Sequence, residues 1–262
     1  MYKREYQLLV FLTILLLSGC TSISSADNEI AGTRPKIEPS EALQKAQGLY
    51  DQRKDLDKVR EAIKLLEKAR DPDNRNFDVE WKFAQFSYFL GSRENIDETE
   101  AQKVLKRGLT SAKIAKRLEP SKPDGYFWYA AILGNQSKRS PVTVGVVSIK
   151  KIRQAMKKVI EIDPNYQGAS AYDGLGQLEL GSRGLGGGSA EKAVEYLEKA
   201  LELNKENSYI RLHLGEAYLA VNKDAEAKKQ LQYVLAMKAD PDFIPEHEEA
   251  KAKAKKLLEQ KF

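Results

Sequence analysis

Small and apolar residues recur along the chain in triplets that are spaced four and then three residues apart. In chain order the triplets are Ala62, Leu66 and Ala69; Gly108, Ala112 and Ala115; Ile152, Met156 and Val159; Ala193, Leu197 and Ala200; and Ala227, Leu231 and Val234. Because steps of four and three residues return to one side of an α-helix, each triplet predicts a helix with one buried face. Its small members let neighbouring helices approach closely, and its middle member fills the space between them. Prolines at 72, 120 and 164 follow the first three triplets and end these helices.

A candidate first helix precedes each triplet, so the helices come in pairs. The expected first helices cover residues 43–50, 79–90, 126–133, 169–180 and 210–218, and a closing helix covers residues 245–260. The lysines and glutamates of the closing helix suit a solvated cap. Residues 141–149 are the sole β-like run, and no alternation is long enough to predict a sheet. We therefore predict an all-α helical-repeat solenoid of about five helix pairs plus a C-terminal capping helix, over residues 41–262.

This repeat resembles the tetratricopeptide repeat. The triplets that begin at Ala193 and Ala227 lie one repeat length of 34 residues apart. Leu214, Gly215 and Tyr218 match the L-G-x2-Y core of that repeat. The resemblance is close in the last two repeats and looser in the first three; the alternative is a helical bundle with coincidental spacing. Connectors at residues 91–99, 135–148 and 182–188 depart from the plain repeat, and such insertions often lie on a binding edge.

The N-terminus has the pattern of a bacterial export signal. Lys3 and Arg4 precede an apolar run at residues 8–17, which is too short to span a bilayer. Residues 17–20, Leu-Ser-Gly-Cys, resemble a lipobox, and Cys20 is the sole cysteine of the chain. We predict a signal peptide over residues 1–19, lipidation of Cys20 and a flexible polar tether over residues 20–40. The alternative is an ordinary signal peptide that contains a cysteine.

Charge and location narrow the functional classes. Thr21, rather than an aspartate, follows the cysteine, which resembles the pattern of lipoproteins delivered to the outer membrane, facing the periplasm. A sole, lipidated cysteine leaves no intrachain disulfide and no thiolate metal site. The 43 basic and 38 acidic residues are interspersed, which suits solvated helix faces better than a nucleic-acid footprint. Removal of the signal peptide lowers the formal net charge from +5 to +4.

Two stretches carry a more specific resemblance. They are RGLTSAKIAKRLEPSKPDGYFWYAAILG, residues 107–134, and MKKVIEIDPNYQGASAYDGLGQLELGSRGLGGGSAEKAVEYLEKALELN, residues 156–204. With the lipobox, they resemble the TatT proteins, the T-component associated with tripartite ATP-independent periplasmic (TRAP) transporters. The resemblance covers roughly residues 96–240 and covers the first repeat poorly. Where that family often has a proline and a leucine before its glycine pair, this chain has Ser182, Arg183, Gly184 and Leu185.

The resemblance implies a helical-repeat protein that forms a homotrimer and partners a periplasmic solute-binding protein. A ligand-conducting channel through each protomer has been suggested for that family. Eukaryotic microtubule-dynamics regulators share a similar third helix pair, but the lipobox argues against them. The alternative is a general cell-envelope scaffold with no transport role, which uses its repeats to assemble other envelope proteins.

Candidates for catalysis are few. The chain has two histidines, and His213 lies between two leucines on an expected helix, where packing or surface exposure is the ordinary role. No H-E-x-x-H or G-x-S-x-G motif occurs, and no nucleophile partner is recognisable. We predict that the protein is not an enzyme and uses neither a cofactor nor a metal.

Binding is the better-supported role. In such solenoids, particular first-helix positions form the concave wall, and aromatic rings with a few polar groups suit an extended or apolar ligand. Counting from the L-G positions places nine residues on this wall: Trp81, Gln85, Tyr88, Phe127, Asp173, Gln177, Tyr209, Leu212 and Glu216. The alternative for Trp81, Phe127 and Trp128 is that they pack between helices.

A glycine-rich stretch, SRGLGGGSAEKA at residues 182–193, raises the question of phosphate binding. No strand precedes it, and no lysine follows the glycines in the G-K-[ST] position. We expect instead a connector between the two helices of repeat four, with Ser189 capping the second helix. Arg183, Gly186 and Gly187 could border a binding site through the arginine and the exposed amides.

Overall fold

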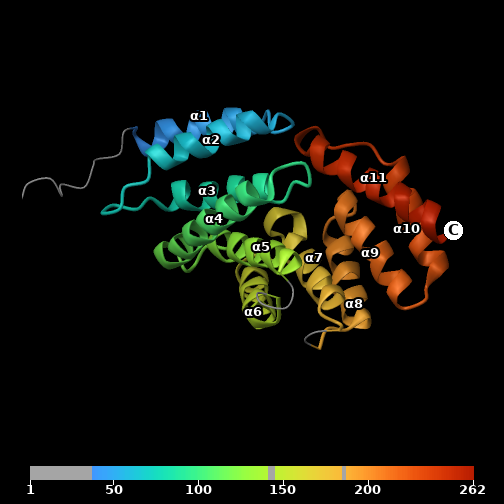
Figure 1. The fold of residues 1–262 in the computed structure, drawn as a ribbon. Helices are drawn as coiled ribbons and strands as arrows, with labels where there is room; N and C mark the ends of the chain where they lie inside the picture. The colour runs from blue at the N-terminus through green and yellow to red at the C-terminus, as the bar shows by residue number, and fades with distance from the viewer. Residues whose placement is uncertain (1–36, 141–144, 185–186) are drawn as a thin grey trace, which may run out of the picture. The chain divides into compact units, whose positions relative to one another are not determined.

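A computed structural model describes residues 37–140, 145–184 and 187–262 (Figure 1). Every regular element in these residues is helical. The elements are α1 (Pro39–Tyr50), α2 (Leu56–Lys68), α3 (Phe77–Gly91), α4 (Glu98–Leu118), α5 (Asp124–Arg139), α6 (Val146–Ile162), α7 (Tyr166–Gly181), α8 (Ala190–Leu203), α9 (Ser208–Ala220), α10 (Asp224–Ala236), the short 3-10 helix η2 (Pro241–Phe243) and α11 (Ile244–Lys261). The predicted all-α solenoid of five helix pairs with a closing helix is confirmed. The expected signal peptide, Cys20 and the tether up to residue 36 lie outside the described residues.

The helices pack in the order of the chain. Each helix contacts the next, and the odd-numbered helices also contact one another in sequence, from α1 with α3 to α9 with α11. The even-numbered helices contact only their neighbours in sequence. The first helices of the pairs therefore form one continuous layer, and the second helices lie against it.

The triplets form the core between these layers, as predicted. Leu197 of α8 and Leu231 of α10 are completely buried, and so are the small residues on either side of them. A side chain at Gly176 of α7 would place its Cβ 2.5 Å from Leu197, and one at Gly215 of α9 would lie 3.0 Å from Leu231. The glycine of each L-G step thus makes room for the middle leucine of the paired helix.

Two expected local structures differ from the observed ones. The β-like run ends in α6, because Val146 to Ile149 form its first turn; residues 141–144 lie outside the described residues. Burial of Ile149 and Ile152 on one helical face outweighs the β-propensity of the valines. The helix expected from residue 169 begins earlier, because α7 starts at Tyr166. Its first turn contains left-handed backbone angles, at φ 50° for Gln167, 63° for Gly168 and 65° for Ala169.

The closing helix α11 returns to the beginning of the repeat array. Arg53, in the turn between α1 and α2, donates to both carboxylate oxygens of Glu246 at 3.0 and 3.1 Å, and to the backbone carbonyl of Asp242. Beside it, Lys54 lies 3.3 Å from Glu248. Figure 1 shows this turn pointing toward the start of α11. We call these two ion pairs the end clasp.

One side of α11 is therefore less solvated than expected of a cap. Ala250, Ala254 and His247 are buried, and Glu246 keeps only 21% of its side chain exposed. The lysine and glutamate content indicated a helix facing water, but it did not reveal that cations from the first helix pair lie opposite the glutamates.

Candidate functional site

Asp173 and His213 join the fourth and fifth helix pairs on the layer of first helices. Asp173 Oδ1 lies 2.7 Å from His213 Nδ1, and both side chains are 13% exposed. The Tyr209 ring, one turn earlier on α9, stacks on His213 with ring centroids 5.5 Å apart. Gln177 donates from Nε2 to the other carboxylate oxygen of Asp173 at 2.8 Å. Three of these four residues were predicted for the wall, and the structure brings them together.

The group extends to α5 through a lysine. Lys138 Nζ donates to Gln177 Oε1 at 3.1 Å, so the Gln177 amide links Lys138 to Asp173. A carboxylate that already accepts from an amide and an imidazole is fixed in orientation, because its lone pairs are aimed at both donors. This part of the wall is therefore preorganised.

Glu249 adds α11 to the same region. Arg93, which follows α3, lies 2.7 Å from Glu249, and Lys253 lies 2.6 Å from the other oxygen. Burial opposes ionisation of Glu249, but the hydrogen bond from Lys253 and the Arg93 charge together hold the pKa of Glu249 below its usual value. Burial raises the pKa of Tyr209, and the Glu249 carboxylate raises it further.

Tyr88 of α3 faces the same charges. Burial raises the pKa of Tyr88, Asp173 and Glu249 raise it further, and Arg93 opposes them. The ring lies 5.7 Å from the Trp128 ring between centroids. Six side chains from α3, α7, α9 and α11, together with Arg93 from the connector after α3, thus surround one region. We call them the inner cluster, and they are Tyr88, Arg93, Asp173, Gln177, Tyr209, His213 and Glu249.

Three predicted wall residues are partly exposed without joining the inner cluster. Trp81 donates from Nε1 to Asp78 at 3.0 Å, and Lys82 Nζ lies 4.4 Å from the centre of its ring. The Oε1 atom of Gln85 is buried with no hydrogen-bond partner among the described residues. Glu216 is half-buried on α9.

Two predicted wall residues belong to the core instead. Phe127 is 8% exposed and contacts the Trp128 and Tyr166 rings, with centroids 4.9 and 5.3 Å apart. Leu212 is 1% exposed and packs on Leu231 between α9 and its neighbours. A step of one residue turns a side chain about 100° around a helix, so a small error in the count moves it from the wall to the core. The alternative that Phe127 and Trp128 pack between helices is the correct one.

His213, Arg93 and Glu249 are the cluster residues that sequence reasoning missed. His213 lies four residues after Tyr209, so it shares the helical face of a predicted wall residue, and this spacing was an available signal. Arg93 lies in a connector and Glu249 in the closing helix. Their proximity depends on the return of α11 to the first pairs, and no local pattern contains that information.

The glycine-rich connector closes the end of α7. Ser189 caps α8 as predicted, accepting from the Lys192 amide at 3.2 Å. A Cβ on Gly188 would lie 2.2 Å from the Glu179 carbonyl oxygen, which requires glycine there. The 3% exposed Glu179 carboxylate accepts from the Ser189 amide and pairs with Arg153 of α6 at 2.7 Å. The buried Glu179 carboxylate thus fixes the position of Ser189, where α8 begins.

No binding partner for the connector follows from its geometry. Arg183 is exposed and donates to the Leu180 carbonyl at 3.0 Å, and Gly187 is exposed with φ 75°. Gly186 lies outside the described residues. Within residues 37–140, 145–184 and 187–262, no three His, Cys, Asp or Glu side chains are grouped as metal ligands. The helices described there include none that is both long and apolar enough to cross a membrane.

Comparison with known families identifies the repeats. A model of the family described as Regulator of microtubule dynamics protein 1-3 matches residues 42–176, just over half of the chain. The chain belongs to this family. A second model, described as Tetratricopeptide repeat, matches residues 185–254. This family match corrects the expectation from the lipobox, which argued against these regulators, because an export signal carries no information about the repeats that follow it.

Solved structures agree on the fold. A thermophilic tetratricopeptide-repeat protein of Thermus thermophilus matches with a TM-score of 0.61 and 19% identity, over 84% of this chain and 98% of that one. Pseudomonas aeruginosa PilF matches with a TM-score of 0.52 and 16% identity, over 85% and 90%. A search of curated protein sequences gave no significant match. Neither matched family model describes an enzyme, and repeats of this kind generally serve as protein-interaction scaffolds.

Proposed function

We propose that this protein binds a partner segment or ligand against the inner cluster and the neighbouring wall residues Trp81, Gln85 and Glu216. The observation that carries the proposal is the Asp173–His213 contact at 2.7 Å with Tyr209 stacked on the histidine. Side chains from separate repeats are held there in fixed orientations on a partly exposed surface. Such fixed polar groups among aromatic rings provide specificity, because little side-chain entropy is lost on binding.

The composition of the region indicates what it holds. Tyr88, Tyr209 and Trp81 offer flat apolar area. Asp173 and Glu249 offer carboxylates that already have partners, an imidazole nitrogen for Asp173 and the Arg93 cation for Glu249. An extended segment with apolar side chains and a few hydrogen-bond donors suits this combination better than a strongly charged ligand.

We further propose that the chain works as a lipoprotein. Its Cys20, at the end of an apolar run, receives the lipid, and residues 21–38, which precede α1, hold the repeats at the outer membrane facing the periplasm. The sequence pattern alone supports this proposal. A Cys20→Ser variant expressed from the full-length gene tests it: the wild-type chain partitions with membranes, and the variant is found in the soluble envelope fraction. Equal partitioning of both contradicts lipid anchoring at Cys20.

The preferred partner is the periplasmic solute-binding protein of a TRAP transporter, which the resemblance to TatT proteins supports. The alternative is a general envelope scaffold without a transport role. The family's name refers to microtubules, and we do not extend that partner to this chain because the N-terminal pattern predicts export from a bacterial cytoplasm.

A capture experiment with the full-length chain tests the proposal. The protein is isolated from solubilised membranes, its partners are identified, and the affinity of each purified partner is measured for Trp81→Ala and Tyr209→Ser. Tyr233→Ser, at an exposed site on α10, is the matched control. We expect both wall variants to weaken binding by about tenfold or more, as anchor aromatic residues do. Unchanged affinity in folded variants refutes binding at the inner cluster and the neighbouring wall residues. Recovery of only envelope-assembly proteins refutes the transporter role.

A further inference from the structure

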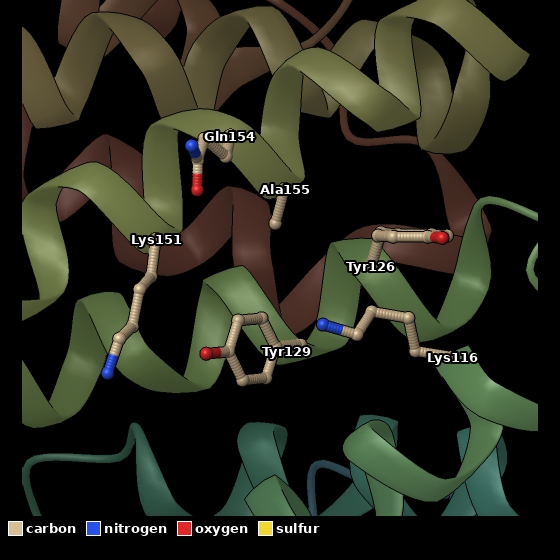
Figure 2. Close-up of a pocket in the computed structure, with 6 residues that line it drawn as sticks. All are labelled: Lys116, Tyr126, Tyr129, Lys151, Gln154 and Ala155. Atoms are coloured by element: carbon tan, nitrogen blue, oxygen red, sulfur yellow. The ribbon is translucent and has the colours of Figure 1, made fainter.

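A recess lies between the second helices α4 and α6. It is a cleft of about 270 Å³ lined by Lys116 of α4, Tyr126 and Tyr129 of α5, and Lys151, Gln154 and Ala155 of α6. Figure 2 shows the Lys116 side chain extending toward the Tyr129 ring, with Lys151, Gln154 and Ala155 on the neighbouring helix. Helix α5 contacts both α4 and α6, whereas α4 and α6 do not contact each other. The cleft is therefore a groove with α5 as its floor, and we call it the basic groove.

Lys116 is held inside the groove by two aromatic rings. Its Nζ atom lies 4.4 Å from the Tyr129 ring centre and 5.6 Å from that of Tyr126. Burial lowers the pKa of Lys116, and the nearby Lys113 lowers it further. No carboxylate offsets this effect, and no ion pair to Lys116 or Lys151 exists within the described parts of the chain. The ring contacts fix the ammonium group but leave its charge unneutralised.

Lys151 supplies a second cation from the opposite wall. It is exposed on α6, and the Tyr129 hydroxyl points toward the side of the groove that carries it (Figure 2). Gln154, one turn later on α6, adds an amide that can donate and accept. An acidic segment that enters the groove thus meets an ammonium group on each wall and a phenol between the walls.

The surrounding helices reinforce the charge. Residues 101–118 of α4 and 146–160 of α6 contain no aspartate or glutamate. Their cations are Lys103, Lys106, Arg107, Lys113, Lys116 and Arg117 on α4, and Lys150, Lys151, Arg153, Lys157 and Lys158 on α6. Of these, only Arg107, Arg153 and Lys158 pair with carboxylates in the described structure. In a chain whose charges are otherwise interspersed, this concentration creates a local positive potential that attracts an acidic partner.

We propose that the basic groove binds an acidic segment of a partner protein, with carboxylates of that segment paired to Lys116 and Lys151. A protein segment fits better than a membrane surface, because Lys116 is partly buried and lies against two tyrosine rings that a flat surface cannot contact with it. The tyrosine rings accommodate the methylene groups of glutamate or aspartate, and Gln154 suits a peptide amide. This site lies on different helices from the inner cluster, so it does not depend on the function proposed above.

The test uses the folded chain and a fluorescently labelled peptide of alternating glutamate and serine. A peptide of alternating glutamine and serine gives the uncharged reference. We expect the double variant Lys116→Gln/Lys151→Gln to bind the acidic peptide about tenfold or more weakly, because close charge pairs are lost. The matched control is Lys229→Gln/Lys256→Gln, at exposed sites on α10 and α11, which removes the same charge and should stay within about twofold of wild type. Lys151→Gln alone, at an exposed site, should give a partial loss of binding with an unchanged unfolding temperature.

Three results would overturn the proposal. The first is equal weakening in both double variants, which indicates attraction by net charge alone. The second is equal affinity for the acidic and the uncharged peptide. The third concerns vesicles that contain anionic phospholipid. If the groove variant binds these vesicles more weakly than wild type but binds the acidic peptide equally well, the groove is assigned to a lipid surface. Unfolding temperatures of all variants are measured alongside, so that a loss of fold is not mistaken for a loss of binding.

Discussion

Arg53→Met tests the end clasp, because methionine keeps the aliphatic length of the side chain and removes its charge and donors. Arg53 is 8% exposed, and its guanidinium lies 5.2 Å from the Tyr50 ring centre and 6.0 Å from that of Phe243. The substitution leaves the Glu246 carboxylate without its cation and the Asp242 carbonyl without its donor. Both acceptors lose partners in a place that water reaches only partly.

The expected cost follows from this partial burial. Removal of one partner from a buried ion pair costs about 3–5 kcal/mol, and we take the lower end, about 3 kcal/mol, because the Glu246 side chain remains 21% exposed. Lys54→Met is the matched control, since the adjacent residue also pairs with α11 but through side chains that are 72% and 56% exposed. Its expected cost is about 0–0.5 kcal/mol, as for other solvated pairs.

Urea unfolding of the wild type and both variants, followed by circular dichroism, measures the two free energies of unfolding. We expect a clear loss for Arg53→Met and almost none for Lys54→Met. A loss below about 0.5 kcal/mol for Arg53→Met refutes the reasoning. So does an equal loss for the two variants, because burial would then not distinguish the two ion pairs.

Three further predictions concern the connector, a buried acid and pH. Gly188→Ala should destabilise the fold by about 1–3 kcal/mol, since its Cβ would lie 2.2 Å from the Glu179 carbonyl oxygen, whereas Gly181→Ala, with nothing within 4 Å, should be neutral or slightly stabilising; thermal unfolding compares them. Glu80→Ala should lower the free energy of unfolding by about 3 kcal/mol in the same assay, because this fully buried carboxylate pairs with two arginines. A loss as small as that of an exposed ion pair would contradict this reasoning. The Glu249 carboxylate has a lowered pKa, so its stabilisation is complete above the usual value of 4.5 and is lost as the pH falls toward the lowered one. Glu249→Gln should therefore flatten the acid limb of the curve of stability against pH, and an unchanged limb argues against that contribution.

The repeat architecture could be predicted because it is encoded locally. Spacings of four and three residues place Ala193, Leu197 and Ala200 on one face whatever lies elsewhere in the chain, and the structure buries all three completely. The Ser189 cap and the need for glycine in the connector also depend on a few adjacent residues. Such patterns can be recognised in a single sequence, because backbone geometry fixes both the spacing of side chains along a helix and the hydrogen bonds needed at its ends.

The site was only partly predictable because it depends on contacts between distant residues. Counting along α7 and α9 found Asp173, Gln177 and Tyr209, yet the same count misplaced Leu212 by a fraction of a turn. The partner of Asp173 lies 40 residues away on the next pair. The partner of Arg93 lies 156 residues away, on a helix whose composition suggested solvent. Nothing in either local segment specifies those distances.

The end clasp limits how this repeat array can change during evolution. In an open solenoid each repeat touches only its neighbours, so a pair can be duplicated or deleted at the cost of one interface. Here Arg53 precedes the second helix and must meet Glu246, 193 residues later. One helix pair more or fewer would move α11 away from that arginine and leave buried charges on both sides without partners. The clasp thus selects for a fixed number of repeats, and relatives that lack an arginine at this position should vary more freely in length.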